Sequence, residues 1–302
     1  MSLFDRVVVR LLPAVPRRVV RRVSAPYIAG PTLADARATV ASLNAEGKLA
    51  TVDVLGEEIT RPEEARAIAG AYREVLAAIE HDALEANVSV KLTALGLKLD
   101  PSLARELLGE VVRDARARDI FVRIDMEDSS CTDETLALYR ELRAAGLDGV
   151  GIVLQAALRR TLADIADLAD LQPRVRLCKG IYVEPASVAF RDDDVIRRCF
   201  VASLEALLAA GCHVGVATHD EALIRAALDR FGGLPRTAYE LQMLLGVREG
   251  RASELVAAGH PLRVYVPFGR RWYEYSLRRL QENPKVAGYV AGDVARRLVP
   301  GR

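Results

Sequence analysis

Two charged residues stand in apolar runs, where a polar side chain needs a partner. Lys91 ends the alternating part of the run 87–93, and Asp125 lies between apolar neighbours in the run 120–128. Burying an unpaired charge is costly, so we expect Lys91 to pair with Asp125 or with Asp53. An ammonium group in this place could also bind the carboxylate of a substrate. The two roles are compatible, because an ion pair can hold the lysine in position.

A second cationic feature is the adjacent pair Arg278 and Arg279. It lies in the segment 271–282, whose apolar residues have helical spacing. Neighbouring residues diverge by about 100° around a helix, but two arginines are long enough to converge on one small anion. A guanidinium group binds a carboxylate through two parallel hydrogen bonds. The alternative is a solvated, charged helix face.

These residues need a fold that brings many strand ends together. Eight short β-rich runs alternate with longer segments whose apolar residues recur every three or four positions. The runs are 50–56, 87–93, 120–128, 149–156, 174–180, 212–220, 237–244 and 262–269. This alternation predicts an α/β fold with parallel strands, and eight units favour a (β/α)8 barrel of the TIM type. The competing doubly wound sheet usually carries a glycine-rich phosphate turn, and the sequence has neither G-x-G-x-x-G nor G-x-x-x-x-G-K-[ST].

The expected chemistry lies at the carboxyl ends of these strands. A dense ring of polar residues is predicted there, at 53, 91, 125, 155, 176, 179, 218, 219, 240, 242 and 265. We expect residues 1–45 to form an N-terminal helical arm and residues 46–302 to form the barrel. The helix predicted over 271–282 would overhang the barrel mouth.

Composition excludes several classes of protein. Hydrophobic residues are 51% and charged residues 27%, which is an ordinary globular balance. A formal charge of +1 argues against general nucleic-acid binding. The four cysteines show no C-x-x-C spacing, so we expect reduced thiols in a cytoplasmic protein. The four histidines form no H-x-H or H-E-x-x-H motif, so we expect no metal. The arginine-rich start is either a solvated arm or a weak contact with an anionic membrane surface.

Several segments together resemble proline dehydrogenase, the flavin enzyme that oxidises proline. They run in the family's order from Tyr27 to Pro284. The blocks are TVDVLGE, VSVKLTALGL, VRIDMEDS, VLQAALRRT, VRLCKGIY, ATHD, YELQMLLG and YVPFGRRWYEYSLRRLQENP. The resemblance is to the short, monofunctional bacterial form. It implies a distorted (β/α)8 barrel with FAD at its mouth, Δ1-pyrroline-5-carboxylate as product, and a quinone as electron acceptor.

The resemblance also implies a role for each matching residue. Lys91, Arg278 and Arg279 would hold the proline carboxylate, and Asp125 would anchor Lys91 beside the reacting centre. Arg176 would approach the flavin and tune it. Four residues would line the proline ring or support the arginines, namely Leu177, Tyr265, Tyr275 and Glu282. The FAD-binding set would be Met126, Gln155, Lys179, Gly180, Ile181, Thr218 and His219.

Two other functions remain open at this point. A Schiff-base aldolase on the same barrel would use Lys91 or Lys179 as its amine. A non-catalytic relative would bind proline without turning it over. For the flavin enzyme we expect a cytoplasmic location with peripheral attachment at the inner face of the cell membrane, and we leave the oligomeric state open.

Overall fold

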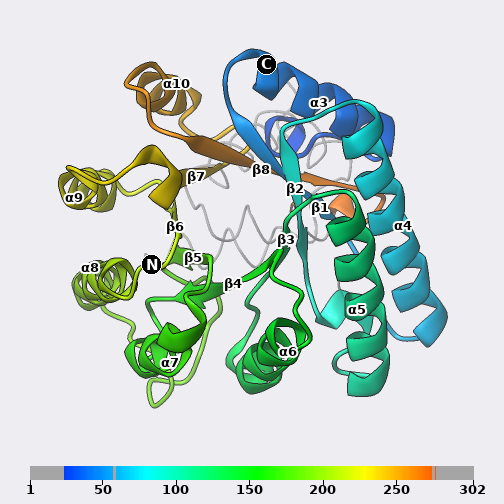
Figure 1. Cartoon of the computed structure of the whole chain (residues 1–302), viewed down its shortest axis with the longest axis horizontal. Coiled ribbons are helices and arrows are strands. Elements are labelled where there is room, and N and C mark those ends of the chain that lie inside the picture. Colours follow the sequence, from blue (N-terminus) through cyan, green and yellow to red (C-terminus); the bar gives the residue numbers. More distant parts are fainter. Residues whose placement is uncertain (1–23, 57–58, 274–275, 277–302) are drawn as a thin grey trace, which may run out of the picture.

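Eight parallel strands close into a barrel, as the alternating pattern predicts (Figure 1). The structure, a computed structural model, describes residues 24–56, 59–273 and 276. The strands are β1 Leu49–Val54, β2 Ala86–Val90, β3 Val122–Ile124, β4 Val150–Gln155, β5 Val175–Cys178, β6 Val214–Ala217, β7 Tyr239–Leu244 and β8 Leu262–Phe268. Each strand pairs with the next, and β8 closes on β1. Each of the eight predicted runs overlaps one of these strands, and β1 and β2 begin one residue before their runs.

A ring of helices surrounds the barrel (Figure 1). Its members after β1 are α4 Pro62–His81, α5 Pro101–Ala117, α6 Thr132–Ala144, α7 Thr161–Leu168, α8 Asp193–Ala209, α9 Glu221–Phe231 and α10 Glu249–Ala257. Short 3-10 turns are η2 Ala25–Tyr27, η3 Thr93–Leu95, η4 Ser129–Cys131, η5 Ala169–Leu171 and η6 Arg236–Ala238. Local sequence explains where α5 begins. Pro101 fits the first turn, and the Asp100 carboxylate accepts a hydrogen bond from the Ser102 amide at 2.9 Å.

Helix α3, Leu33–Ala45, covers the junction between β8 and β1. Ala36, Val40 and Leu43 are buried in the same hydrophobic core as the barrel strands. In a (β/α)8 barrel each strand is followed by a helix, so the helix after the last strand would ordinarily fill this place. Here a helix that precedes the first strand fills it. The described part of the predicted arm therefore belongs to the outer layer of the barrel, and a domain boundary at residue 45 stays a prediction.

The predicted C-terminal helix begins at Trp272. The Ser276 hydroxyl donates to the Trp272 carbonyl at 2.6 Å, four residues earlier, as it does in a helix. Trp272 packs against Ile28 and Leu55. The predicted site residues of this helix, which are Tyr275, Arg278, Arg279 and Glu282, lie outside the described residues, as do residues 1–23.

The inside of the barrel is polar, in contrast to its apolar outer face. Alternation along each strand turns apolar residues such as Val88 and Leu177 outward to the helices, where they are fully buried. Large polar side chains point inward, and glycines make room for them. A Cβ atom on Gly151 would lie 2.3 Å from the Arg174 carbonyl oxygen and 2.7 Å from Nη1 of Arg123. The barrel core is thus built to hold charge.

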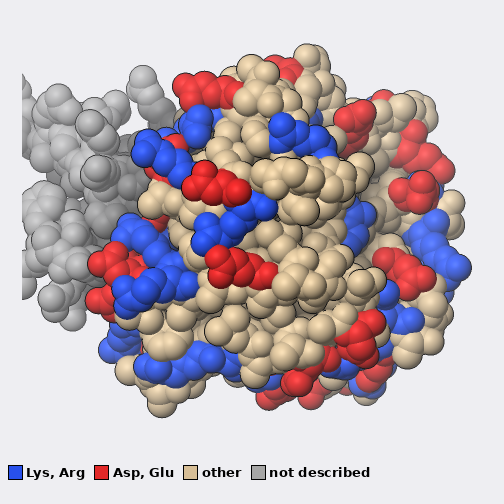
Figure 2. Space-filling model, turned by 60° about the vertical axis from the view of Figure 1, so that its left-hand side comes forward, with Lys and Arg blue, Asp and Glu red and all other residues tan. Residues whose placement is uncertain are grey.

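The outer surface mixes charges of both signs. On the face drawn in Figure 2, acidic and basic side chains lie next to one another. Ion pairs join neighbouring helices, including Arg230 to Glu205 at 2.6 Å and Arg251 to Glu221 at 3.0 Å. Exposed pairs contribute at most about 1 kcal/mol each, so apolar burial holds the helices in place. Within the described ranges, no helix is both long enough and apolar enough to span a bilayer.

Candidate active site

A cavity of about 380 Å³ lies at the carboxyl ends of the strands. Its volume is in the range of small-molecule binding sites. The predicted catalytic, substrate-binding and FAD-binding residues that the structure describes all line it, namely Lys91, Asp125, Met126, Gln155, Arg176, Lys179, Gly180, Ile181, Thr218, His219 and Tyr265. The remaining wall consists of Val153, Cys178, Tyr182, Ala217, Gln242, Met243 and Leu244. Parallel strands aligned in one barrel bring these distant segments together.

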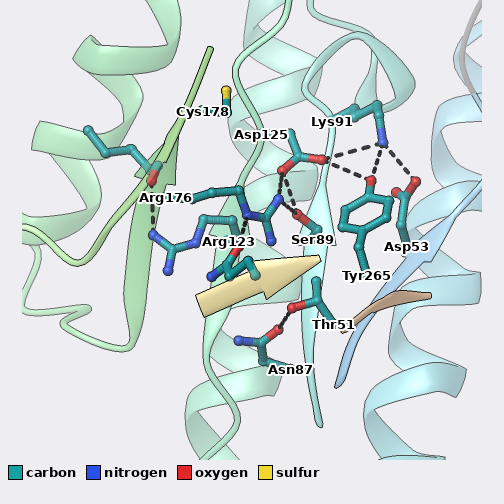
Figure 3. A network of polar contacts seen from close by, with 12 residues as sticks. Thr51, Asp53, Asn87, Ser89, Lys91, Arg123, Asp125, Arg176, Cys178 and Tyr265 are labelled. Carbon is teal, nitrogen blue, oxygen red and sulfur yellow. Dashed lines mark hydrogen bonds and ion pairs between the residues drawn. The ribbon is translucent and has the colours of Figure 1, made fainter. Parts of the chain in front are cut away.

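Lys91 directly follows β2 and is held by three oxygen atoms (Figure 3). Its Nζ lies 2.7 Å from Asp53 Oδ2, 2.9 Å from Tyr265 Oη and 3.4 Å from Asp125 Oδ2. The expected ion pair is therefore confirmed with both aspartates. The ammonium group also lies 5.7 Å from the centre of the Tyr265 ring. These contacts fix a cation at the cavity wall before any substrate is present.

Asp125 is the junction of the network in Figure 3. Its Oδ1 accepts hydrogen bonds from Ser89 Oγ at 2.5 Å and from Arg176 Nη1 at 2.7 Å, and its Oδ2 accepts one from Tyr265 Oη at 3.2 Å. Burial alone would raise the pKa of Asp125, but the charges of Arg176 and Lys91 outweigh burial and keep this pKa below its ordinary value. Asp125 is therefore ionised at neutral pH.

Asp53 carries the network outward to the helical ring. Its carboxylate is fully buried, and the Tyr72 hydroxyl of α4 lies 3.1 Å from Oδ1. The same hydroxyl donates to the Ser89 carbonyl at 2.6 Å. Burial raises the pKa of Tyr72 well above its ordinary value, so the phenol keeps its proton. The position of Lys91 thus depends on a helix that does not line the cavity.

Arg176 enters the cavity from β5. Besides Asp125, its Nη1 contacts Ser89 Oγ at 3.1 Å, and its Nε donates to Gln242 Oε1 at 2.6 Å. The guanidinium carbon lies 5.3 Å from the centre of the Tyr265 ring. The side chain is 9% exposed. A buried cation with this many contacts is fixed in direction as well as in place.

Gln155 and Gly180 form a cradle at the ends of β4 and β5. Gln155 Nε2 donates to the Glu127 carbonyl at 2.8 Å. Gly180 has φ of 101°, and a Cβ atom there would lie 2.9 Å from Gln155 Oε1. Backbone conformation and space both require glycine at this position. A ligand can therefore approach the main chain closely here.

Residues later in the chain position Lys179 and His219 at the cavity. Lys179 Nζ binds Asp220 Oδ2 at 2.6 Å, and Arg197 Nε binds the same oxygen at 2.7 Å. Burial would raise the pKa of Asp220, but these two bonds lower it to about 2. His219 Nε2 accepts a hydrogen bond from the Leu244 amide at 3.0 Å. In the neutral ring the proton is then on Nδ1, which makes that atom a donor.

The structure corrects one expectation for the proline ring. Leu177 does not line the cavity, because it is fully buried in the main hydrophobic core. Its neighbours Arg176 and Cys178 point the other way and line the wall. Burial raises the pKa of Cys178 to about 11, so it is a neutral thiol and not an activated nucleophile. Alternation along the strand is the signal that could have excluded Leu177.

Sequence reasoning missed the supporting roles of Ser89, Tyr72 and Gln242. Ser89 and Tyr72 carry no signal in the sequence beyond their position on a strand and a helix. Gln242 stands in the predicted polar ring, but its contact with Arg176 crosses the barrel. Among the described residues, no group of three metal-binding side chains is close enough to hold an ion.

Comparison with known proteins gives one consistent family. A family model described as "Proline dehydrogenase" matches residues 36–291. Proline dehydrogenase 1 of Bacillus subtilis subsp. natto is 38% identical over 266 residues, which are 87% of this chain and 88% of the relative. Proline dehydrogenase of Deinococcus radiodurans is 35% identical over 271 residues, with 87% of both chains covered.

The fold also matches a solved structure. Proline utilization A (PutA) from Bdellovibrio bacteriovorus, inactivated by N-propargylglycine, superposes with a TM-score of 0.82 and 23% identity. The match covers 93% of this chain but 36% of the PutA chain, so this chain spans about a third of that protein. At this identity the likeness supports the barrel fold.

Proposed function

This chain belongs to the proline dehydrogenase family and oxidises proline to Δ1-pyrroline-5-carboxylate, and we propose that it does so with FAD bound at the barrel mouth and a quinone as electron acceptor. The observation that carries this proposal is the convergence of fixed charges on one cavity. Lys91 and Arg176 reach the same wall from β2 and β5 and share Asp125 between them. A carboxylate-binding cation and a second cation for the developing charge are thus held together.

The residues present fit a flavin. Gly180 leaves the main chain open where a Cβ atom would fill the space, and Lys179 and His219 provide donors beside it. The residues that would hold FAD are Met126 through its backbone, Gln155, Lys179, Gly180, Ile181, Thr218 and His219. When bound, FAD supplies the acceptor for the hydride that leaves the proline ring. Arg176 would stabilise the negative charge that this transfer creates.

The described part of the site is balanced in charge. Lys91 and Arg176 are matched by Asp53 and Asp125, with which they make direct ion pairs. A substrate carboxylate adds a further negative charge and needs further cations. We assign this task to Arg278 and Arg279, which would hold the carboxylate together with Lys91. Tyr275 and Glu282 would complete the wall around the ring.

Orientation is the main contribution of these residues to the rate. Clamping the carboxylate fixes the ring carbon next to the amine, from which the hydride leaves. The amine must be neutral when the hydride leaves. Because Asp125 is ionised, it forms an ion pair with Lys91, accepts a hydrogen bond from Tyr265 and has no proton to give to that amine. Tyr265 lies against Lys91 and Asp125 and would form one side of the substrate pocket.

A visible spectrum tests the proposal. The purified chain, incubated with FAD and freed of excess, should show the absorption bands of oxidised flavin. Adding L-proline without an electron acceptor should bleach them, and a short-chain quinone should restore them. A folded chain that retains no flavin, or a flavin that proline does not bleach, would overturn the proposal.

The aldolase alternative gains no support from the geometry. A Schiff base needs a free amine, whereas Lys91 forms ion pairs with two aspartates and Lys179 forms one with Asp220. Borohydride reduction in the presence of a carbonyl substrate should therefore leave both lysines unmodified. A trapped adduct on either lysine would reopen this alternative.

A further inference from the structure

Gln242 lines the cavity from β7 but has no task in the proposed reaction. It is 6% exposed. Its side-chain oxygen accepts the hydrogen bond from Arg176 Nε at 2.6 Å, and its Nε2 donates to Glu240. Gln242 therefore joins the cation at the cavity wall to a carboxylate deeper in the barrel.

Glu240, deeper in the barrel, fixes the direction of the Gln242 amide. Both carboxylate oxygens of Glu240 accept a hydrogen bond from Arg263 Nε, each at 3.0 Å. Burial would raise the pKa of Glu240, but the charge of Arg263 and its hydrogen bonds lower it to about 2. An ionised carboxylate only accepts hydrogen bonds. Gln242 must then turn its NH2 group toward Glu240 and its oxygen toward Arg176.

The neighbouring strand provides a socket for the amide. Gly215 of β6 has no side chain, and a Cβ atom there would lie 2.4 Å from Gln242 Nε2 and 3.0 Å from its Cδ. The backbone of Gly215 is not in the left-handed region, so space and not conformation calls for glycine. The barrel is shaped around this one orientation of Gln242.

Arg176 is consequently held at two of its three nitrogens. Nε is bound by Gln242, and Nη1 is bound by Asp125 and Ser89. Within residues 24–56, 59–273 and 276, Nη2 makes no hydrogen bond to the protein. The contact with Gln242 holds the guanidinium group at a second nitrogen, and so it restricts the plane of this group further than the bonds of Nη1 do alone.

We propose that Gln242 is a positioning residue, which fixes the guanidinium of Arg176 and thereby sets how readily the bound flavin accepts electrons. The inference rests on the proposed function, in which Arg176 lies beside the flavin. Gln242 itself touches neither substrate nor reacting atoms in this scheme. A side chain that only fills the barrel would leave the redox properties of the flavin unchanged.

Two variants separate these roles. Q242M keeps the length of the side chain but removes the acceptor for Arg176. G215A keeps the glutamine and forces its amide to move. Gly149→Ala is the matched control, because nothing lies within 4 Å of a Cβ atom there. All are compared as full-length chains reconstituted with FAD, and each value is taken per bound flavin.

The readouts are the midpoint potential of the flavin, its reduction rate by proline in a single turnover, and the dissociation constant of a proline analogue. For Q242M and G215A we expect a potential lower by about 30 mV, which is a tenfold change for a two-electron couple. The reduction rate should fall by about tenfold, while analogue binding changes less than about threefold. Gly149→Ala should behave as the parent.

Parental potentials and reduction rates in both variants would overturn the inference. A loss confined to analogue binding would also overturn it, since Gln242 would then act on the substrate. If the parent chain takes up no flavin, the proposed function fails and this inference fails with it. If the parent takes up flavin and proline bleaches it, the results for the two variants test only the role of Gln242.

Discussion

Replacing Lys91 by methionine should destabilise the folded chain and weaken proline binding. The ammonium group lies 2.7 Å from Asp53, which is fully buried, and 3.4 Å from Asp125. Methionine keeps most of the length of the side chain and removes the ammonium group with its charge and its hydrogen bonds. The variant therefore leaves two carboxylates beside each other without the cation between them.

The size of the loss follows from what each carboxylate retains. Removing one partner of a buried ion pair costs about 3–5 kcal/mol. Asp125 keeps Arg176 at 2.7 Å, and Asp53 keeps the Tyr72 hydroxyl at 3.1 Å. We therefore expect about 3 kcal/mol at pH 7, the lower end of that range. Lys98→Met is the matched control, because Lys98 pairs with Asp128 on the surface and should lose at most about 1 kcal/mol.

Urea unfolding of the flavin-free chains at pH 7 and pH 5 measures this cost. Without Lys91 the pKa of the neighbouring carboxyl groups rises, so at lower pH one of them takes a proton and the repulsion decreases. The cost of the substitution should therefore be smaller at pH 5. A cavity or packing defect would cost the same at both values.

A double-mutant cycle gives the sharpest result. In the background of Asp53→Asn, Lys91→Met should cost at least about 1 kcal/mol less than in the parent, because the buried charge is already gone. In the reconstituted enzyme, Lys91→Met should raise KM for proline by about 10- to 100-fold, the value of a hydrogen bond to a charged group, with normal flavin content. Additive effects, or a loss below 1 kcal/mol that is equal at both pH values, would refute the reasoning.

Two further predictions concern the barrel interior. The pKa of Glu240 is lowered to about 2, so its contribution to stability is present above about pH 4.5 and is lost as the pH falls toward 2. When urea unfolding is measured at a series of acid pH values, Glu240→Gln should reduce this fall in the free energy of unfolding by up to about 3 kcal/mol. The exposed control Glu254→Gln should follow the parent. Gly151→Ala should lower the free energy of unfolding by about 1–3 kcal/mol, because its methyl group meets a carbonyl oxygen and Arg123, while Gly149→Ala should change it by less than 1 kcal/mol; equal melting curves for the two alanine variants would contradict the packing argument.

The eight strands could be predicted because the barrel imposes one environment on all of them. Each strand is covered by helices on its outer face, which demands apolar residues at every second position. Chemistry at the carboxyl ends then follows from the parallel direction of the strands. The pair formed by Lys91 and Asp125 was predictable for the same reason, since β2 and β3 are neighbours in the sheet.

Contacts across the barrel could not be predicted in this way. Arg176 meets Gln242 from β7, and Lys91 meets Tyr265 from β8, 174 positions later. Which inward side chains meet depends on the stagger of the strands around the barrel, and a sequence pattern gives the facing of a residue but not this stagger. The mistaken placement of Leu177 has a different cause. Resemblance placed it in the site, and its facing on β5 places it in the core.

The polar interior also explains how a neutral cavity can act on charged substrates. Successive ion pairs and hydrogen bonds lead from the mouth into the barrel and join Asp53, Lys91, Asp125, Arg176, Gln242, Glu240 and Arg263 in this order. Each cation lies between two acceptors, so its direction is fixed before a ligand arrives. Groups that are fixed in this way need no reorganisation when charge develops in the reaction, and that is the condition under which electrostatic stabilisation is largest. The stability of the barrel interior and the orientation of the site are therefore two consequences of one network. Substitutions deep in the barrel should consequently change the orientation of the charged groups at its mouth.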